Sequence, residues 1–209
     1  EIARTGPQMA QALQAAAAAL PGAHILALTL PSRAEQVQDL LRAVPAPATV
    51  VTDPAQKWNA FAAMDAALAV SGTVGLELAV AGVPHAICYR MNKLTYALVR
   101  PRIRVKYAHL ANILLDEPVV PELIQQDCTP DNLTAALLPL LTDGGARARQ
   151  KQAFSKIHHL LRGEHAGTPA QQAAAFVLGL QEEKTPACAG AQEVPEEKSR
   201  NYLRSSIAT

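Results

Sequence analysis

The stretch that decides the fold spans residues 65–90 and reads DAALAVSGTVGLELAVAGVPHAICYR. Two short apolar runs, residues 66–70 and 85–90, enclose a longer segment with helical character over residues 72–82. Because buried parallel strands are short and almost wholly apolar, this order predicts a strand, a helix and a second strand. A small hydroxyl-bearing turn, Ser-Gly-Thr at residues 71–73, joins the first strand to the helix.

A membrane-spanning helix is the alternative for so apolar a stretch. Such a helix needs about twenty apolar residues without a break. Here two glycines, a carboxylate and a proline interrupt the run at Gly72, Glu77, Gly82 and Pro84. We therefore interpret the stretch as a strand–helix–strand crossing of a folded domain.

The preceding residues continue the alternation of helix and strand. We expect helices at residues 5–22, 32–44 and 54–64, and strands at residues 24–30 and 48–53. Alternation of this kind is typical of βαβ units, which build parallel sheets covered by helices. The predicted fold class is therefore α/β, a Rossmann-like parallel sheet with helices on both faces.

Two of these helices carry start signals. Ser32 stands three residues ahead of Glu35, which is the spacing of a capping box. Asp53 has the chemistry of an N-cap, and Pro54 follows at the first helical position.

The character of the chain changes after Arg90. Residues 91–115 are basic, with tyrosines and leucines interleaved. Carboxyl-terminal helices are then expected at residues 121–126, 131–141, 145–163 and 169–181. We expect one domain over residues 1–180 and a polar, disordered tail over residues 181–209, where the periodicity is lost.

Composition narrows the function classes. The chain has 209 residues, 49 % of them hydrophobic, and 19 basic against 18 acidic residues give a net charge of +1. This balance favours a globular chain and gives no reason to expect nucleic-acid binding. Three scattered cysteines indicate neither a disulfide framework nor a zinc site, and they fit a reducing cytosol. The opening EIARTGPQMAQ has no signal-peptide pattern and no initiator Met, so we expect a piece of a longer protein.

The Ser-Gly-Thr turn is the strongest candidate for a binding site. In an open parallel sheet, ligands lie at the carboxyl ends of the strands, above the N-termini of the following helices. The first N–H groups of a helix and its dipole favour an anion, and Ser71, Gly72 and Thr73 add hydroxyl donors and close backbone access. Glu77 lies one turn further along the same helix, where a carboxylate could accept from both ribose hydroxyls. A phosphate at the turn and a ribose one turn away describe a nucleotide. The alternative is that Ser71 or Thr73 only caps the helix and that Glu77 is a capping or surface residue.

A set of ordered motifs resembles the carboxyl-terminal half of the lipid-A-disaccharide synthases, which are glycosyltransferases of family 19 with the GT-B architecture. The signature SGT-x-x-LE stands at residues 71–77, and a tyrosine–basic pair follows the next strand as Tyr89 and Arg90. The asparagine loop of the family appears as HLANILLDEPVVPEL, with Asn112 kept and Ala111 where the family usually has proline. The family's glutamine corresponds to Gln125 or Gln126. The resemblance covers residues 1–180, and residues 1–7 look like the segment just after the family's GSR phosphate loop.

The resemblance implies a function in lipid A biosynthesis. The family transfers 2,3-diacylglucosamine from UDP-2,3-diacylglucosamine to 2,3-diacylglucosamine 1-phosphate, and UDP leaves. It implies a UDP site made of Ser71, Gly72, Thr73, Glu77, Tyr89, Arg90, Asn112 and Gln125, with no cofactor and no metal. The GSR loop and the amino-terminal domain, where the acceptor site and the catalytic base are expected, lie outside this sequence. The chain alone should therefore bind UDP at best and lack transferase activity. The resemblance also implies a cytoplasmic protein, peripheral on the inner membrane of a Gram-negative bacterium, and allows a homodimer.

A basic stretch at residues 90–106 has two interpretations. Its arginines, lysines and tyrosines suit a surface that attracts an anionic membrane and an acylated substrate. They also suit a solvated helix face with one or two phosphate contacts. His109, which follows this stretch, is either a catalytic histidine or a loop histidine that caps or packs, and Cys88 is expected to be a buried strand residue.

Two other functions remain open. One is a different UDP-sugar GT-B enzyme, such as an epimerase or a peptidoglycan-type transferase. The other is a truncated module that binds UDP or dimerises without activity.

Overall fold

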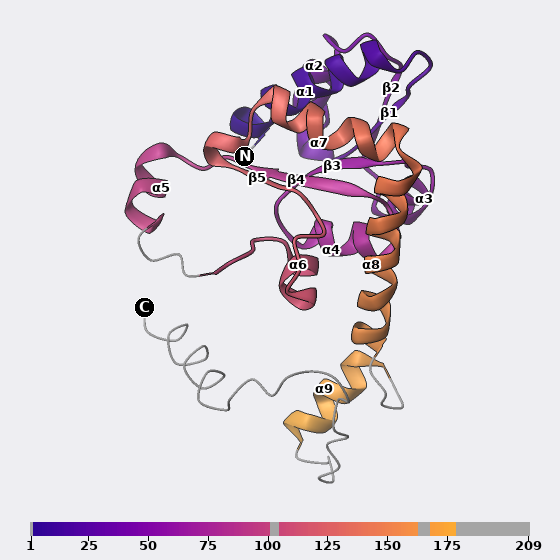
Figure 1. Ribbon diagram of the computed structural model, residues 1–209, viewed down its shortest axis with the longest axis vertical. Helices are drawn as coiled ribbons and strands as arrows, with labels where there is room; N and C mark the ends of the chain where they lie inside the picture. The colour runs from indigo at the N-terminus through magenta and orange to yellow at the C-terminus, as the bar shows by residue number, and fades with distance from the viewer. Residues whose placement is uncertain (1, 101–104, 163–167, 179–209) are drawn as a thin grey trace. The chain divides into compact units, whose positions relative to one another are not determined.

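The computed structural model describes residues 2–100, 105–162 and 168–178 (Figure 1). The chain forms two compact units, residues 1–163 and 164–209. In the second unit the structure describes one helix, α9 (Pro169–Val177), which begins with a capping box between Thr168 and Gln171. The tail expected at residues 181–209 lies outside the described residues, so the domain boundary at residue 180 stays a prediction.

The first unit alternates helices and strands along the chain. The strands are β1 (Ile25–Leu28), β2 (Ala48–Val51), β3 (Ala67–Val70), β4 (His85–Tyr89) and β5 (Glu122–Ile124). The helices are α1 (Ile2–Ala19), α2 (Ala34–Leu41), α3 (Lys57–Ala62), α4 (Thr73–Val80), α5 (Lys93–Val99), α6 (Leu110–Leu115), α7 (Pro130–Thr142) and α8 (Gly144–Arg162). The predicted strand–helix–strand crossing over residues 65–90 is confirmed as β3–α4–β4.

All described strand pairs are parallel, which confirms the α/β class. β1 pairs with β2, and β3, β4 and β5 form a second sheet in that order. Hydrogen bonds thus divide the described strands into a pair and a trio, where the sequence predicted one sheet. Within the described residues, no helix is both long and apolar enough to cross a membrane.

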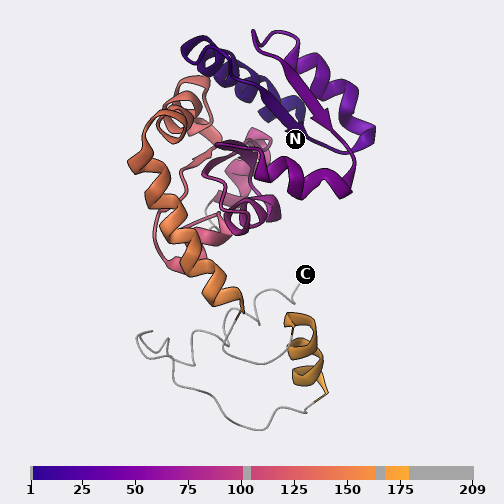
Figure 2. The same ribbon diagram turned by 90° about the vertical axis from the view of Figure 1, so that its right-hand side faces the viewer.

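Helices cover both faces of the three-stranded sheet, as predicted. On one face, α7 contacts β3 and β4, and α1 packs on α7; on the other, α4 contacts the same strands and α6 and α8 pack beside it (Figure 1). The turned view shows α8 alongside the helices of this second face (Figure 2). The larger apolar core lies there, around Phe61, Leu78, Ile87 and Phe154. Burial of these side chains positions the strand ends that carry the polar turn.

Two local predictions were wrong. Residues 121–126 were expected to be helical, but Glu122–Ile124 form β5, in parallel register with β4. A short apolar run does not distinguish a buried strand from a helix turn, so pairing with β4 decided the outcome. The capping box at Ser32 and Glu35 is also absent, since Arg33 is the N-cap of α2 and no side chain caps it. Asp53, by contrast, caps its turn as predicted and accepts from Ala55 N at 2.9 Å.

Candidate nucleotide site

The predicted site residues gather at the carboxyl edge of the three-stranded sheet. The register pairs Val70 with Cys88 and Tyr89 with Ile124. The next residues of the strands, Ser71, Arg90 and Gln125, therefore leave the sheet at the same edge. Ser71 N donates to Cys88 O at 3.0 Å, so the turn begins as a direct extension of the β3–β4 ladder.

The Ser-Gly-Thr turn presents free hydroxyl groups. Gly72 is the N-cap of α4, and no side chain caps the helix, so the interpretation of Ser71 or Thr73 as a simple cap is wrong. Thr73 is exposed and Ser71 half-buried, and neither hydroxyl has a hydrogen-bond partner among the described residues. A Cβ atom at Gly72 would meet no protein atom within 4 Å. The backbone at Gly72 is therefore not covered by another part of the described chain.

Glu77 faces a cation from a neighbouring helix. Its Oε1 accepts from Lys57 Nζ at 2.8 Å, and both side chains are 34 % exposed. Lys57 begins α3, twenty residues earlier in the chain. No pattern in the sequence indicated this pair, because ion pairs between helices depend on packing and not on spacing.

Gln125 is the clearest anomaly at this edge. It is 8 % exposed, has a positive φ of 57°, and its amide Nε2 has no hydrogen-bond partner within the described chain. An unsatisfied buried donor costs free energy, and left-handed backbone is uncommon for a residue other than glycine. Both features are typical of sites completed by a ligand. Gln126 is exposed, so the structure distinguishes the two glutamines that the sequence left open.

Arg90 is held beside the turn by α1. Its backbone N donates to the hydroxyl of the fully buried Thr5 at 3.3 Å, which ties the end of β4 to the first helix. Burial raises the pKa of the Cys128 thiol, and the positive charge of Arg90 opposes that rise. Arg90 thus places a cation at the same edge as the free hydroxyls and the Gln125 amide. Thr5 was not predicted, since a lone threonine in an alanine-rich helix carries no signal.

Comparison with known proteins settles the family. The family model described as lipid-A-disaccharide synthetase matches residues 1–176. The chain belongs to the lipid-A-disaccharide synthetase family. It is 42 % identical over 180 residues to the lipid-A-disaccharide synthase of Rhodospirillum centenum, an alignment that covers 86 % of this chain and 45 % of that protein.

Other relatives carry the same name. The lipid-A-disaccharide synthase of Paramagnetospirillum magneticum is 42 % identical over 160 residues, which is 73 % of this chain and 40 % of that protein. The enzyme of the same name from Pseudomonas syringae pv. tomato is 35 % identical over 181 residues, 86 % of this chain and 46 % of that protein. The chain spans about half the length of the curated relatives it matches.

Asn112, which the family resemblance assigns to the UDP site, lies away from the carboxyl edge of the sheet in this member of the lipid-A-disaccharide synthetase family. It is fully buried, and its Nδ2 donates to Val120 O and to Glu122 Oε1, both at 2.8 Å. Its Oδ1 accepts from Val120 N at 2.8 Å. These partners precede or begin β5, at the opposite end of that strand from Gln125. Both amide hydrogens are therefore used in fixing the loop before β5, and direct contact with UDP stays an untested prediction.

A buried histidine pair adjoins Asn112. His109 Nδ1 accepts from Ala111 N at 3.0 Å, and His85 Nδ1 lies 2.8 Å from Val83 O. The Val83 carbonyl accepts from His85 Nδ1–H, so His109 Nε2–H donates to His85 Nε2 across 2.9 Å. Burial lowers the pKa of each imidazole to about 4, which keeps the pair neutral. His109 caps α6 and packs, as one of the two interpretations expected.

His109 also fixes the position of α4. A Cβ atom built on Gly75 would clash with His109 Nε2, so the imidazole ring lies directly against the helix backbone. Glu122 accepts from the backbone N atoms of Ala108 and His109 at 2.8 and 2.9 Å. His109, held in place by Glu122, therefore supports α4, the helix that begins at the Ser-Gly-Thr turn.

Cys88 is fully buried in β4, as predicted. Burial raises the pKa of its thiol to about 12. No group of three or more His, Cys, Asp or Glu side chains in the described part of the chain is arranged as metal ligands would be.

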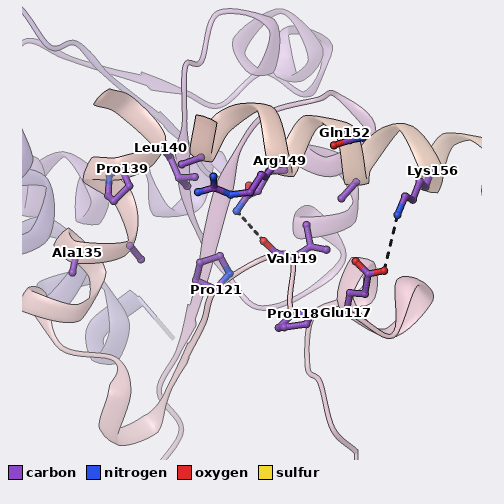
Figure 3. A pocket seen from close by; sticks show the side chains of 14 residues that line it. Glu117, Pro118, Val119, Pro121, Ala135, Pro139, Leu140, Arg149, Gln152 and Lys156 are labelled. Atoms are coloured by element: carbon purple, nitrogen blue, oxygen red, sulfur yellow. Dashed lines mark hydrogen bonds and ion pairs between the residues drawn. The ribbon is translucent and has the colours of Figure 1, made fainter. Parts of the chain in front are cut away.

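A cavity of about 570 Å³ lies away from the predicted site (Figure 3). It is bounded by α7, α8 and the loop before β5, with Pro118, Pro139, Arg149 and Lys156 in its wall. The Gln150 side chain closes one side by donating to Val119 O at 3.2 Å. None of the eight predicted site residues lines it, and Pro121 in its wall precedes β5, so the cavity lies at the amino end of the sheet.

Proposed function

We propose that this chain is the donor-binding half of a lipid-A-disaccharide synthase. In this proposal it binds the UDP group of UDP-2,3-diacylglucosamine, whose sugar is transferred to 2,3-diacylglucosamine 1-phosphate to give the β-linked lipid A disaccharide 1-phosphate. The observation that carries the proposal is the unpartnered buried amide of Gln125, at the same sheet edge as Arg90 and the free hydroxyls of the Ser-Gly-Thr turn.

The groups at and near the Ser-Gly-Thr turn have specific roles in the proposal. The diphosphate oxygens accept from the first N–H groups of α4, from the Ser71 and Thr73 hydroxyls and from the Arg90 guanidinium. Glu77 accepts from the ribose hydroxyls one helical turn away. Donors that are already in place where the departing UDP carries its charge stabilise the transition state without reorganisation. Tyr89 flanks the same strand end.

Catalysis depends on a second lobe in this proposal. The acceptor site and the catalytic base belong to the part of the longer relatives that this chain does not span. GT-B chemistry needs both lobes to close around the donor. Residues 1–209 alone are therefore expected to bind UDP and to show no transfer of diacylglucosamine.

The proposed location is the cytoplasmic face of the inner membrane. Leu94 on α5 is strongly exposed, and Arg100 and Val105, on either side of the gap in the described residues, are exposed too. Apolar and basic side chains together favour an anionic lipid surface. Lys106 is paired with Asp116 at 3.2 Å, which reduces the charge it offers. Arg102 and Arg104 of the predicted basic stretch lie outside the described residues.

Titration with UDP tests the proposal directly. Ser71→Ala combined with Thr73→Val should weaken UDP by roughly 1–3 kcal/mol, the usual range for lost hydrogen bonds to charged groups. A matched control is Ser155→Ala with Thr142→Val, which removes two exposed hydroxyls that bond only within α7 and α8. Isothermal titration calorimetry of both pairs gives the comparison. Equal affinities in folded proteins would place the nucleotide elsewhere.

Further measurements separate the alternatives. The amino-terminal lobe of a full-length relative can be added as a separate protein. If the chain then binds UDP but transfers no diacylglucosamine, a UDP-binding or dimerisation module is favoured. Turnover of a different UDP-sugar favours another GT-B enzyme. Transfer that requires the second lobe and diacylated substrates supports the proposal.

A further inference from the structure

The ion pair between Lys57 and Glu77 differs from the others that the structure describes in this chain. It is the shortest at 2.8 Å and the most shielded, with both side chains 34 % exposed. The pairs Arg42–Asp39, Lys106–Asp116 and Lys156–Glu117 span 3.1–4.0 Å, and all their side chains are more than half exposed. Exposed pairs of that kind contribute little to stability. The shielded pair joins α3 to the helix that begins at the Ser-Gly-Thr turn.

Lys57 is restrained on a second side by the neighbouring tryptophan. Its Nζ lies 5.5 Å from the centroid of the Trp58 ring. That ring meets Phe61 edge to face, with centroids 5.6 Å apart and planes at 89°, and Phe61 is buried in the core. Lys57 thus contacts both Glu77 and an aromatic ring that packs edge-on against the core residue Phe61. A lysine with two such contacts has fewer accessible side-chain conformations than an exposed lysine.

The contact leaves half of the carboxylate available. Lys57 reaches Oε1, and Oε2 of Glu77 has no partner among the described residues. A glutamate side chain rotates about several bonds, and a ligand that must fix it loses affinity to that ordering. A carboxylate already fixed through one oxygen offers the other in a set direction.

We infer that Lys57 is a positioning residue for Glu77, which holds and orients the carboxylate for the ribose hydroxyls of the bound nucleotide. The inference rests on the proposed function, because it takes Glu77 as the ribose acceptor. Lys57 itself touches neither the ribose nor the phosphates in this arrangement. Loss of Lys57 should therefore affect ligands that carry a ribose and spare those that do not.

The test uses the chain of residues 1–209 and three probes: UDP, uridine and pyrophosphate. Lys57→Met keeps the apolar stem and removes the cation. We expect it to weaken UDP and uridine by the same factor, about tenfold, and to leave pyrophosphate within twofold. Lys57→Arg should restore most of the affinity, which a packing defect would not allow. Combined with Glu77→Gln, Lys57→Met should cost nothing further, because both changes disable one unit.

Lys106→Met is the matched control. Lys106 also pairs with a carboxylate, Asp116, and its Nζ lies 4.7 Å from the Tyr107 ring, but it is far more exposed. This variant should bind all three probes like the wild type. Melting temperatures of all variants check that each is folded.

Each contrary outcome overturns the inference in a recognisable way. Equal affinity of Lys57→Met for uridine shows that the pair only links α3 to α4. A parallel loss for pyrophosphate makes Lys57 a direct phosphate ligand, and tighter uridine binding makes it a competitor for Glu77. In these three cases the wild type still binds UDP, so the proposed function stands. If the wild type binds neither UDP nor uridine, the proposed function and the inference fail together.

Discussion

Polar side chains gather at the two ends of β4 and β5, and the two groups differ in how fully they are hydrogen-bonded. The amino-end network consists of His85, His109, Asn112, Glu122 and Gln150. Its members are joined to one another or to backbone groups by bonds of 2.8–3.2 Å. The carboxyl-edge group consists of Ser71, Thr73, Arg90 and Gln125. There two hydroxyls and a buried amide lack partners in the described chain.

This difference distinguishes polar groups that hold the fold from polar groups that we expect to bind a ligand. A buried polar network is stabilising only when every member is satisfied, so a complete network holds a fold in one arrangement. An incomplete one costs stability and is kept where a ligand supplies the missing partners. We therefore expect side chains of the same type, such as Asn112 and Gln125, to have different functions at the two ends. The comparison predicts that changes at the amino end affect folding, and changes at the carboxyl edge affect ligand affinity.

Acid should break the amino-end network with the largest effect. Folding lowers the pKa of both His85 and His109 from 6.5 to about 4. Between those values the unfolded chain binds more protons, so stability is complete above pH 6.5 and falls as the pH drops toward 4. Within this window, each histidine should lower the free energy of unfolding by about 1.4 kcal/mol for each pH unit of acidification. Urea denaturation at pH 7.5, 6, 5 and 4.5 measures the slope. A free energy of unfolding that is constant over this range would contradict the neutral buried pair.

Asn112→Ala should be next in size. It leaves the N–H and C=O of Val120 buried without partners and removes a donor from Glu122. We expect a loss of about 3 kcal/mol in the free energy of unfolding, since unsatisfied buried groups cost 1–3 kcal/mol each. Asn132→Ala is the control, because Asn132 is exposed and its side chain makes one bond, to Asp127 O. UDP affinity of the folded Asn112 variant should be unchanged. A stable variant with lost UDP binding would instead give Asn112 a direct role.

Gln125→Met should have the smallest effect on stability. Unlike Asn112→Ala, it should weaken UDP binding and leave folding intact. The change keeps the length of the side chain and removes the unpaired donor. The free energy of unfolding should stay the same or rise by up to about 1 kcal/mol, while UDP affinity falls about tenfold. Gln126→Met, one residue along and exposed, should alter neither quantity. Calorimetry with UDP and urea denaturation of the two variants make the comparison. A clear loss of stability in the Gln125→Met variant would mean that Gln125 helps to hold the fold, as the amino-end network does.

Local patterns in the sequence were enough to predict the fold class and the position of the Ser-Gly-Thr turn. Alternating apolar runs predicted β3, α4 and β4, and the small residues between them predicted the Ser-Gly-Thr turn at a strand end. The capping role of Asp53 was predictable from its side chain, because its partner, Ala55 N, is only two residues away. These features depend on contacts within a few residues of each other, which spacing in the sequence reports directly.

Long-range pairing decided the rest. The tertiary structure turned residues 122–124 into a strand, because β4 offered a parallel partner. It buried Asn112 among groups eight to ten residues away and joined Lys57 to Glu77 across twenty. It also distinguished Gln125 from Gln126, which are chemically identical and adjacent, through burial and backbone conformation. Whether a polar group is satisfied depends on which distant atoms surround it, and packing of the whole sheet and its helices sets those neighbours.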